Sequence, residues 1–202
     1  MFGNVDIDPP ADPWILFHEW YVLAEKHEPD DPGAMALATS CKDGMPSVRI
    51  ILLRGYKNDQ LVFFTNRLSQ KGEELKENPR AAICLYWKSL DRQIRAEGPV
   101  SLLDDKESDT YFATRPRGSQ IGAWASLQSR PLANRSVLEE QMRALERRYE
   151  GLPVPRPPHW GGYALKPLRI EFWQEREFRL HDRIVYDRGD MTKPWAIERL
   201  FP

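Results

Sequence analysis

The spacing of apolar residues changes near Met35 and divides the chain into an initial helix and a following set of strands. Before that point, Asp12 can cap a helix and Pro13 fits its first turn. The residues that follow keep helical spacing: Leu16, Phe17, Trp20, Leu23 and Ala24. Beyond Met35, short apolar runs separated by polar turns at 42–44 and 57–60 predict a meander of antiparallel strands.

The segment 49–54, RIILLR, is apolar on both faces in its middle and has an arginine at each end. A strand that is buried on both faces has this pattern, so we expect the segment to cross the interior. Arg49 and Arg54 would then place a guanidinium at each end, and guanidinium groups offer several donors to an anion. Both ends of this strand are therefore candidate anion sites.

Ser69 can cap a helix over 70–78, QKGEELKEN, with Lys71 in its first turn. A cation there is unfavourable for the helix dipole unless a bound anion compensates it, and helix N-termini themselves attract phosphates. Arg49 and Lys71 could thus share one phosphate. The alternative is a surface lysine without a partner, and the sequence leaves both open.

Two further strands, 81–87 and 92–103, follow that helix. The second contains Gly98-Pro99, a pair typical of a bulge or an edge strand. We expect the second strand to be interrupted there.

A capping-box pattern that begins at Asp104 opens a helix carrying Tyr111 and Arg115 on one face. The segment 115–126, RPRGSQIGAWAS, mixes cations, glycines and hydroxyls without a clean period, which is typical of a binding loop. Tyr111, Arg115 and Ser119 could therefore cradle a phosphate. An ordinary helix end with a surface arginine is the alternative.

A second capping-box pattern, at Ser136 and Glu139, opens a helix that we interpret as packing rather than chemistry, and the Pro-rich connector 151–162 leads to the closing strands. The pattern gives about seven or eight strands with four helices. It predicts a mainly β fold with peripheral helices, an α+β protein built on an antiparallel barrel. We assign residues 1–202 to one such domain, with 1–12 as a flexible N-terminal arm.

Composition excludes several classes of function. The net charge is −1, from 29 basic and 30 acidic residues, so nothing global indicates a nucleic-acid partner. There is no run of about 18 apolar residues and no signal-peptide pattern, so we expect a cytoplasmic protein that binds no membrane. Cys41 and Cys84 suit a reducing compartment. The chain has no glycine-rich nucleotide loop, no GxSxG motif and no histidine spacing that suits a metal.

The segment 173–188 concentrates basic residues on a pattern typical of a strand. If residues 178–186 are extended, Arg179, His181 and Arg183 point the same way. Like charges repel, so such a row persists in full solvent or against an anionic or electron-rich partner. A solvated edge strand whose charges discourage aggregation is the alternative. Arg and Lys clusters beside aromatic residues suit a phosphorylated, planar ligand.

Several motifs lie between Ala34 and the C-terminus: RIILLRGY, FFTN-x-x-S-x-KG-x-E, the RQ of DRQIRAEG, YFATRPRGSQIGAWAS-x-QS, HWGGY, IEFWQ and RLHDR. Together they resemble the pyridoxamine 5'-phosphate oxidase family. The resemblance implies an antiparallel, FMN-binding split β-barrel. It also implies a homodimer with FMN in clefts at the subunit interface.

The resemblance assigns roles to individual residues. FMN would be held by Arg49, Ile50, Ile51, Leu52, Leu53, Arg54, Phe64, Thr65, Gln70, Lys71, Gln93, Trp173 and Arg183, with Gln128 and Ser129 reaching it from the partner subunit. The substrate phosphate would be bound by Arg54, Tyr111, Arg115 and Ser119. Arg179, Leu180 and His181 would contact the substrate, and Arg179 and His181 would be the catalytic residues that orient it and manage its proton.

The reaction implied by the resemblance oxidises pyridoxamine or pyridoxine 5'-phosphate to pyridoxal 5'-phosphate, with hydride passing to the flavin and dioxygen leaving as hydrogen peroxide. The chain has Arg54 where the family usually has lysine and Gln70 where it usually has arginine. Two alternatives are a sister enzyme of phenazine biosynthesis and a non-catalytic carrier of FMN or pyridoxal phosphate. The intact RPRGSQ and RLHDR motifs favour the oxidase over both.

Overall fold

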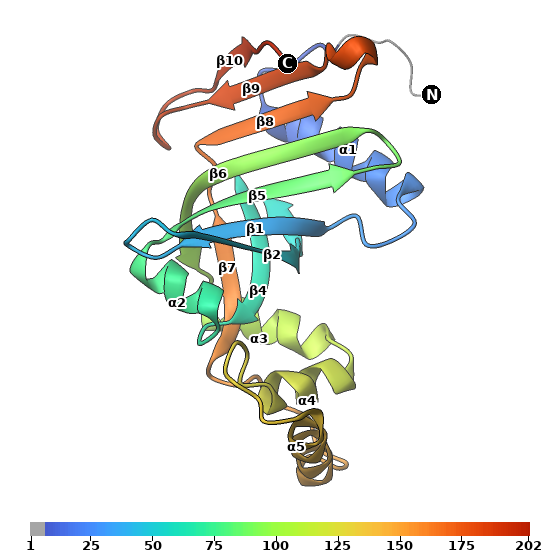
Figure 1. Ribbon diagram of the computed structural model, residues 1–202, viewed down its shortest axis with the longest axis vertical. Helices are drawn as coiled ribbons and strands as arrows, with labels where there is room; N and C mark the ends of the chain where they lie inside the picture. Colours follow the sequence, from blue (N-terminus) through green and yellow to red (C-terminus); the bar gives the residue numbers. More distant parts are fainter. Residues whose placement is uncertain (1–6) are drawn as a thin grey trace.

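The computed structural model describes residues 7–202 (Figure 1), and within them the chain forms five α-helices, one 3-10 turn and ten strands. The helical elements are α1 (Pro13–His27), α2 (Gln70–Glu77), α3 (Asp105–Thr114), α4 (Arg117–Ala125), α5 (Arg135–Arg148) and the 3-10 turn η1 (Glu177–Arg179). The strands are β1 (Ala34–Ser40), β2 (Pro46–Leu52), β3 (Gly55–Lys57), β4 (Gln60–Asn66), β5 (Arg80–Trp87), β6 (Arg92–Leu102), β7 (Trp160–Leu165), β8 (Arg169–Gln174), β9 (Asp182–Asp187) and β10 (Ala196–Arg199). The expected seven or eight strands and four helices are too few, because the short β3 and the glycine-containing α4 have weak sequence patterns and only residues 166–168 separate β7 from β8.

The strands form one antiparallel sheet that curls around the longest strand, β6 (Figure 1). Its main path runs β10-β9-β8-β6-β5-β1-β2. The end of β6 turns to pair with β7, which pairs in turn with β4, and β4 pairs with β3. The prediction of a mainly β, antiparallel fold with peripheral helices is confirmed.

β6 is continuous through Gly98 and Pro99, so the predicted interruption is wrong. A Cβ atom at Gly98 would lie 2.2 Å from the carbonyl oxygen of Lys166, a distance that no side chain tolerates. Glycine is therefore needed because another backbone passes against β6 at this point. Up to this pair β6 pairs with β5 and β8, and beyond it β6 pairs with β7.

β2 lies at the edge of the sheet and pairs only with β1 in the described chain, so the prediction that segment 49–54 crosses the interior is wrong. Alternate residues of β2 face outward, and Val48 and Ile50 are 68% and 69% exposed. The apolar pattern of this strand therefore reflects an uncovered apolar face rather than burial within the chain. Such a face is typical of an interaction surface.

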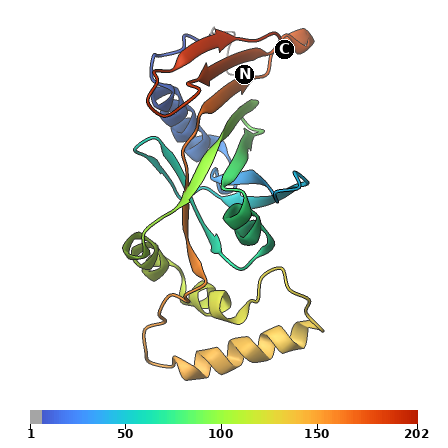
Figure 2. The ribbon, with the colours of Figure 1, turned by 90° about the vertical axis from the view of Figure 1, so that its left-hand side faces the viewer.

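Two hydrophobic clusters hold the protein together. The larger lies between the sheet and α1, where Trp20 packs edge-on against Phe172 of β8 with 5.4 Å between ring centres. The smaller lies under α3 and α4 and includes Phe112, Ile121 and Trp160. α3, α4 and α5 lie at one end of the long axis, and β8, β9 and β10 lie at the other (Figures 1 and 2).

Three predicted helix starts are confirmed by their caps. Asp12 Oδ1 accepts a hydrogen bond from the Trp14 amide at 3.0 Å, and Ser69 and Asp104 cap α2 and α3 in the same way. The predicted capping box at Ser136 is wrong. α5 begins earlier, because Asn134 Oδ1 accepts from the Val137 amide at 3.2 Å and also from the Ser136 hydroxyl.

The first six residues of the arm predicted over 1–12 lie outside the described part of the chain. Ile7, the first described residue, is buried. The Tyr186 hydroxyl donates to the Pro10 carbonyl at 2.8 Å. Among residues 7–202, no helix combines the length and the apolar character that a membrane crossing needs.

Candidate functional site

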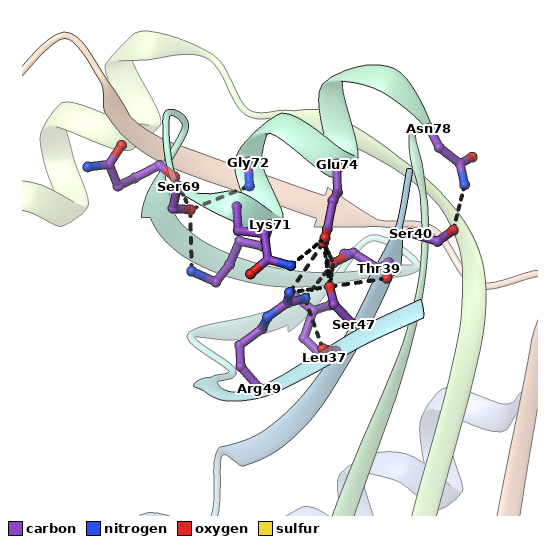
Figure 3. Close-up of polar contacts among 12 residues, drawn as sticks. Leu37, Thr39, Ser40, Ser47, Arg49, Ser69, Lys71, Gly72, Glu74 and Asn78 are labelled. Carbon is purple, nitrogen blue, oxygen red and sulfur yellow. Dashed lines mark hydrogen bonds and ion pairs between the residues drawn. The ribbon is translucent and has the colours of Figure 1, made fainter. Parts of the chain in front are cut away.

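Glu74 on α2 is a buried carboxylate at the centre of polar contacts that join α2 to β1 and β2 (Figure 3). It accepts hydrogen bonds from Ser47 Oγ at 2.6 and 2.8 Å, from Gln70 Nε2 at 2.9 Å and from Thr39 Oγ1. Arg49 Nη2 lies 3.2 Å from Glu74 Oε2. Burial raises the pKa of Glu74, but the hydrogen bonds outweigh burial and lower the pKa to about 2. We call Thr39, Ser47, Arg49, Lys71 and Glu74 the α2 cluster.

Both terminal nitrogens of Arg49 are occupied within the chain. Nη1 donates to the Leu37 carbonyl at 3.3 Å and to Thr39 Oγ1. Nη2 donates to Ser47 Oγ at 2.5 Å and to Glu74. The guanidinium is thus held in one orientation and paired with a carboxylate.

Lys71 is only 6% exposed, which excludes the interpretation of it as a surface lysine. Its Nζ donates to Ser69 Oγ at 3.3 Å, and it has no ion pair within residues 7–202. Burial lowers the pKa of Lys71, the charge of Arg49 lowers it further, and Glu74 raises it. A buried ammonium without a counter-ion is unfavourable, so this position suits a bound anion.

Two cavities adjoin an aromatic stack formed by Phe64, Tyr111 and Trp160, and Phe64 lines both of them. The ring centres of Phe64 and Tyr111 are 4.0 Å apart, and those of Phe64 and Trp160 are 5.3 Å apart. A cavity of about 350 Å³ is lined by Phe64, Thr65, Asn66, Arg115, Ser119, Gly122, Ala123, Ser126, Gln128 and Trp160. A neighbouring cavity of about 580 Å³ is lined by Arg54, Gly55, Lys57, Val62, Phe64, Leu103, Asp104, Lys106, Glu107, Thr110, Tyr111 and Thr114. The four residues predicted to bind the substrate phosphate all line these two cavities.

Arg115 lies at the end of α3 with its guanidinium 4.8 Å from the centre of the Trp160 ring. Its Nη1 is buried and has no hydrogen-bond partner in the described residues. Burial lowers the pKa of Arg115, Tyr111 raises it, and the charge of Arg54 lowers it by a smaller contribution. Arg54 is paired with Asp31 at 3.0 Å, whereas Arg115 has no ion pair within the described residues, so the Arg115 guanidinium favours a bound anion.

The prediction of a binding loop after Arg115 is wrong, because most of this segment is the helix α4. Ser119, Gly122, Ala123 and Ser126 follow the spacing of one helical face and all line the smaller cavity. The helix therefore replaces the loop as the wall of the site. Its glycine and small residues obscured the helical period in the sequence.

A second group of predicted residues lies on three neighbouring strands at the other end of the sheet. Gln93 on β6 is opposite Trp173 on β8, and Trp173 is opposite Arg183 on β9. Arg183 Nε donates to Glu171 Oε1 at 2.8 Å, and this hydrogen bond raises the pKa of Arg183. His181 lies over Trp173 with 4.7 Å between ring centres.

The predicted basic row does not lie on one strand, since β9 begins only at Asp182. Phe178 and Arg179 have positive φ values of 56° and 63°, so the chain turns through η1 instead of alternating. Arg179 and Leu180 are exposed on this turn. His181 Nδ1 accepts a hydrogen bond from the Arg176 amide at 3.2 Å, which leaves Nε2 of the neutral ring to carry the proton.

The structure thus brings the predicted residues together in separate groups rather than in one pocket. Trp173, His181 and Arg183 belong to the end of the molecule with β8 and β9, whereas Tyr111, Arg115 and Ser119 belong to the end with α3 and α4 (Figure 1). Gln128 lines the cavity that contains Arg115 of its own chain, and the exposed Ser129 has a positive φ of 71°. Their contact with a partner subunit's cofactor stays a prediction.

The residues present fit a phosphorylated ligand better than a metal ion. Within residues 7–202, the buried Lys71 ammonium has no ion pair and the buried Nη1 of Arg115 has no hydrogen-bond partner, and both groups attract an anion. Among residues 7–202, no three His, Cys, Asp or Glu side chains come together in a way that could hold a metal ion.

Comparison with known proteins identifies the family. Residues 24–148 match the family model described as pyridoxamine 5'-phosphate oxidase, and residues 160–202 match that of the pyridoxine 5'-phosphate oxidase C-terminal dimerisation region. The chain belongs to the pyridoxamine 5'-phosphate oxidase family. The pyridoxine/pyridoxamine 5'-phosphate oxidase of Zymomonas mobilis is 53% identical over 191 residues, covering 95% of this chain and 98% of the relative. That of Rhodopseudomonas palustris is 49% identical over 197 residues, covering 98% and 93%.

Solved structures confirm the family's fold. PhzG from Burkholderia lata, in complex with tetrahydrophenazine-1-carboxylic acid, has a TM-score of 0.91 and 34% identity, covering 99% of this chain and all of that one. A pyridoxamine 5'-phosphate oxidase-related, FMN-binding protein from Nostoc punctiforme has a TM-score of 0.74 and 21% identity, covering 95% and 98%. At 21% identity, the Nostoc punctiforme structure supports the fold alone.

Three residues of the site lie in motifs quoted in the sequence analysis but were given no role there: Glu74 in FFTN-x-x-S-x-KG-x-E, Trp160 in HWGGY and Glu171 in IEFWQ. Glu74 holds Arg49, Glu171 holds Arg183, and Trp160 supports Arg115. Glu74 lies four residues after Gln70 on the predicted helix, and this spacing could have found the contact between them. Glu171 lies two residues before Trp173 on the same face of a strand, which is a weaker signal. Trp160 had no signal beyond its place in the HWGGY motif.

Proposed function

We propose that this protein is an FMN-dependent pyridoxine/pyridoxamine 5'-phosphate oxidase that forms pyridoxal 5'-phosphate. The observation that carries the proposal is the pair of cationic sites built for anions, Lys71 in the α2 cluster and Arg115 beside the aromatic stack. One suits the phosphate of FMN and the other the phosphate of the substrate. The curated relatives with about half of their residues identical support the same activity.

We propose further that the active enzyme is a homodimer with sites shared between subunits. Within one chain, the groups around Trp173 and around Arg115 lie at opposite ends of the molecule (Figure 1). A second copy would bring the two ends together, with Arg179 and His181 of one chain facing the phosphate site of the other. The match of residues 160–202 to a dimerisation region supports this arrangement.

In this function, the chain's own residues bind, orient and shield the reactants. Arg54, Tyr111, Arg115 and Ser119 bind the substrate phosphate at one end of the substrate. Arg179 presents an exposed guanidinium to the pyridine ring, and His181 presents Nε2–H as a hydrogen-bond donor. Bound FMN would supply the electron acceptor for the two electrons that leave C4' and would pass them to dioxygen, which is released as hydrogen peroxide.

A second candidate function is suggested by the structural similarity to PhzG, whose structure contains a tetrahydrophenazine carboxylic acid. A carboxylated tricyclic substrate would not need the phosphate site that Arg115 and Ser119 form. The higher identity to the curated oxidases also favours the phosphorylated substrate.

A direct comparison of substrates separates these candidates. Purified protein would be supplied with FMN and oxygen and with one of four compounds: pyridoxine 5'-phosphate, pyridoxamine 5'-phosphate, unphosphorylated pyridoxine or tetrahydrophenazine-1-carboxylic acid. Hydrogen peroxide would be measured with all four, and pyridoxal 5'-phosphate with the two phosphorylated compounds. The proposal expects equal amounts of the two products and at least about tenfold preference for the phosphorylated compounds. Turnover only of tetrahydrophenazine-1-carboxylic acid would establish the second candidate instead.

A further inference from the structure

The α2 cluster contains a carboxylate in a place where a phosphate is to be bound, which is unexpected for an anion site. Glu74 is 4% exposed and belongs to the same helix turn as Lys71 (Figure 3). A buried negative charge there repels an incoming phosphate. Its presence therefore calls for a specific role.

The contacts of Glu74 define that role. Four side chains donate to the carboxylate, from Thr39, Ser47, Arg49 and Gln70. They come from β1, β2 and α2, so the carboxylate fixes the strands against the start of the helix. The same contacts fix the direction of the Arg49 guanidinium and offset its charge.

Lys71 is left as the cation of this cluster without a carboxylate partner in the described residues. Its Nζ is drawn away from Glu74, toward Ser69 at the start of α2 (Figure 3). An ammonium has three donors, and one hydrogen bond is made to Ser69. The other two donors have no partner in the described residues.

We propose that Glu74 is a positioning residue of the phosphate site, which holds Arg49 in place and offsets its charge so that Lys71 alone supplies the uncompensated charge. This inference rests on the proposed function, in which the phosphate belongs to FMN. The side chains of Arg49, Lys71 and Glu74 then give the site a net charge of +1, whereas Arg49 and Lys71 without Glu74 would give +2. Glu74 thus has two effects: its charge lowers the affinity for the phosphate, and its hydrogen bonds fix the geometry of the site.

The test measures flavin affinity rather than enzyme activity. Dissociation constants of FMN and riboflavin, which lacks the phosphate, are measured on flavin-free protein by fluorescence titration for the wild type and for Glu74→Gln. Glutamine keeps the shape and removes the charge. We expect FMN to bind about tenfold more tightly to Glu74→Gln, because the charge of Arg49 is no longer offset, and riboflavin affinity to be unchanged.

Glu73→Gln is the matched control. It removes the same charge one position away, but Glu73 is 44% exposed and pairs with Arg130 at 3.7 Å outside the cluster. Its FMN affinity is expected to change by less than about twofold. Unchanged or weaker FMN binding in Glu74→Gln would overturn the proposal, and so would an equal change in FMN and riboflavin.

Lys71 variants provide a measurement that does not depend on the folding of Glu74→Gln. Wild-type FMN affinity should fall toward alkaline pH as Lys71 loses its proton, with Arg49 and Glu74 as the charged groups that face it. Lys71→Arg should abolish this fall, since a guanidinium stays charged. A flat profile in the wild type would contradict the assignment of the site's charge to Lys71.

The failure of this inference differs from the failure of the proposed function. If the wild type bound FMN no better than riboflavin, the function and the role of Glu74 would both be wrong. If the wild type preferred FMN but Glu74→Gln left that preference unchanged, only the role of Glu74 would be wrong.

Discussion

The guanidinium of Arg115 lies over the ring of Trp160 at 4.8 Å, while its buried Nη1 has no hydrogen-bond partner in the described chain. The ring holds the guanidinium in the wall of the cavity, and the unpaired Nη1 is a donor that a bound anion would satisfy. This pairing of a stacked cation with an unused donor is the feature of the substrate cavity that most directly indicates phosphate binding.

Arg115→Met should therefore raise the KM for pyridoxine 5'-phosphate by about tenfold to a hundredfold, because a charge-assisted contact to the phosphate is lost. Arg117→Met is the control on the next helix. Arg117 donates to the Tyr149 and Leu152 carbonyls instead of facing the cavity. Steady-state kinetics should show an unchanged KM for the control, and equal KM values for the two variants would contradict the assignment.

Arg179→Ala should slow flavin reduction by at least about tenfold while FMN stays bound, because an orienting contact to the substrate is lost. The side chain is exposed on η1, so its removal should leave the melting temperature nearly unchanged. Anaerobic stopped-flow absorbance measures the reduction step. A variant that reduces flavin at the wild-type rate would show that Arg179 has no catalytic role.

Val48→Asp should convert a dimer into a monomer at micromolar concentration, because a second copy that covers the outer face of β2 would bury the new charge. Leu152→Asp is the matched control, since Leu152 is also an exposed apolar side chain, at 57%, but lies beyond α5. Size-exclusion chromatography with light scattering gives the mass of each variant. A Val48→Asp protein that stays dimeric would place the interface elsewhere.

The free energy of unfolding should depend on pH through the ionisation of Glu74. Its pKa is lowered from 4.5 to about 2 in the folded protein, so its contribution is complete above about 4.5 and is lost as the pH falls toward 2. The full contribution is on the order of 3 kcal/mol. Urea titrations should show a steeper loss of stability over this range in the wild type than in Glu74→Gln, and parallel curves would contradict the lowered pKa.

Gly98→Ala should lower the free energy of unfolding by about 2 to 4 kcal/mol, because the new Cβ would lie 2.2 Å from the Lys166 carbonyl oxygen. Gly118→Ala on α4 is the opposite case. No atom lies within 4 Å of its added Cβ, and alanine favours a helix by about 1 kcal/mol over glycine. Denaturant unfolding of both variants should give changes of opposite sign.

The parts of the fold that depend on local chemistry could be predicted from the sequence. Asp12, Ser69 and Asp104 are caps, and a cap acts on amides two or three residues away, so the starts of α1, α2 and α3 were correct. The antiparallel sheet also followed from short apolar runs between turns.

The errors occur where distant or unusual contacts decide the structure. The turn η1 depends on positive φ values at Phe178 and Arg179, and neither residue type indicates such a backbone. The outer face of β2 looked like a buried strand because an uncovered apolar face and a buried one have the same residues. Gly98 interrupts nothing, since its role is set by the Lys166 backbone far along the chain.

The candidate site was predictable residue by residue only through the family resemblance. The spacing of Tyr111 and Arg115 indicated a shared face, and both line neighbouring cavities of the site. The separation of Trp173 from Arg115 was not visible in the sequence, because it depends on the direction in which the sheet extends (Figure 1). The role of a buried residue such as Glu74 depends on the atoms packed against it, and the sequence does not show these atoms.

The most direct test of the proposed function is the visible absorbance spectrum of the purified protein, recorded without air before and after the addition of pyridoxine 5'-phosphate. We predict flavin bands that bleach on addition and return when air is admitted, since substrate oxidation and flavin reoxidation are then separate steps. Flavin bands that never bleach with this substrate, or a protein that takes up no FMN at all, would contradict the proposed function.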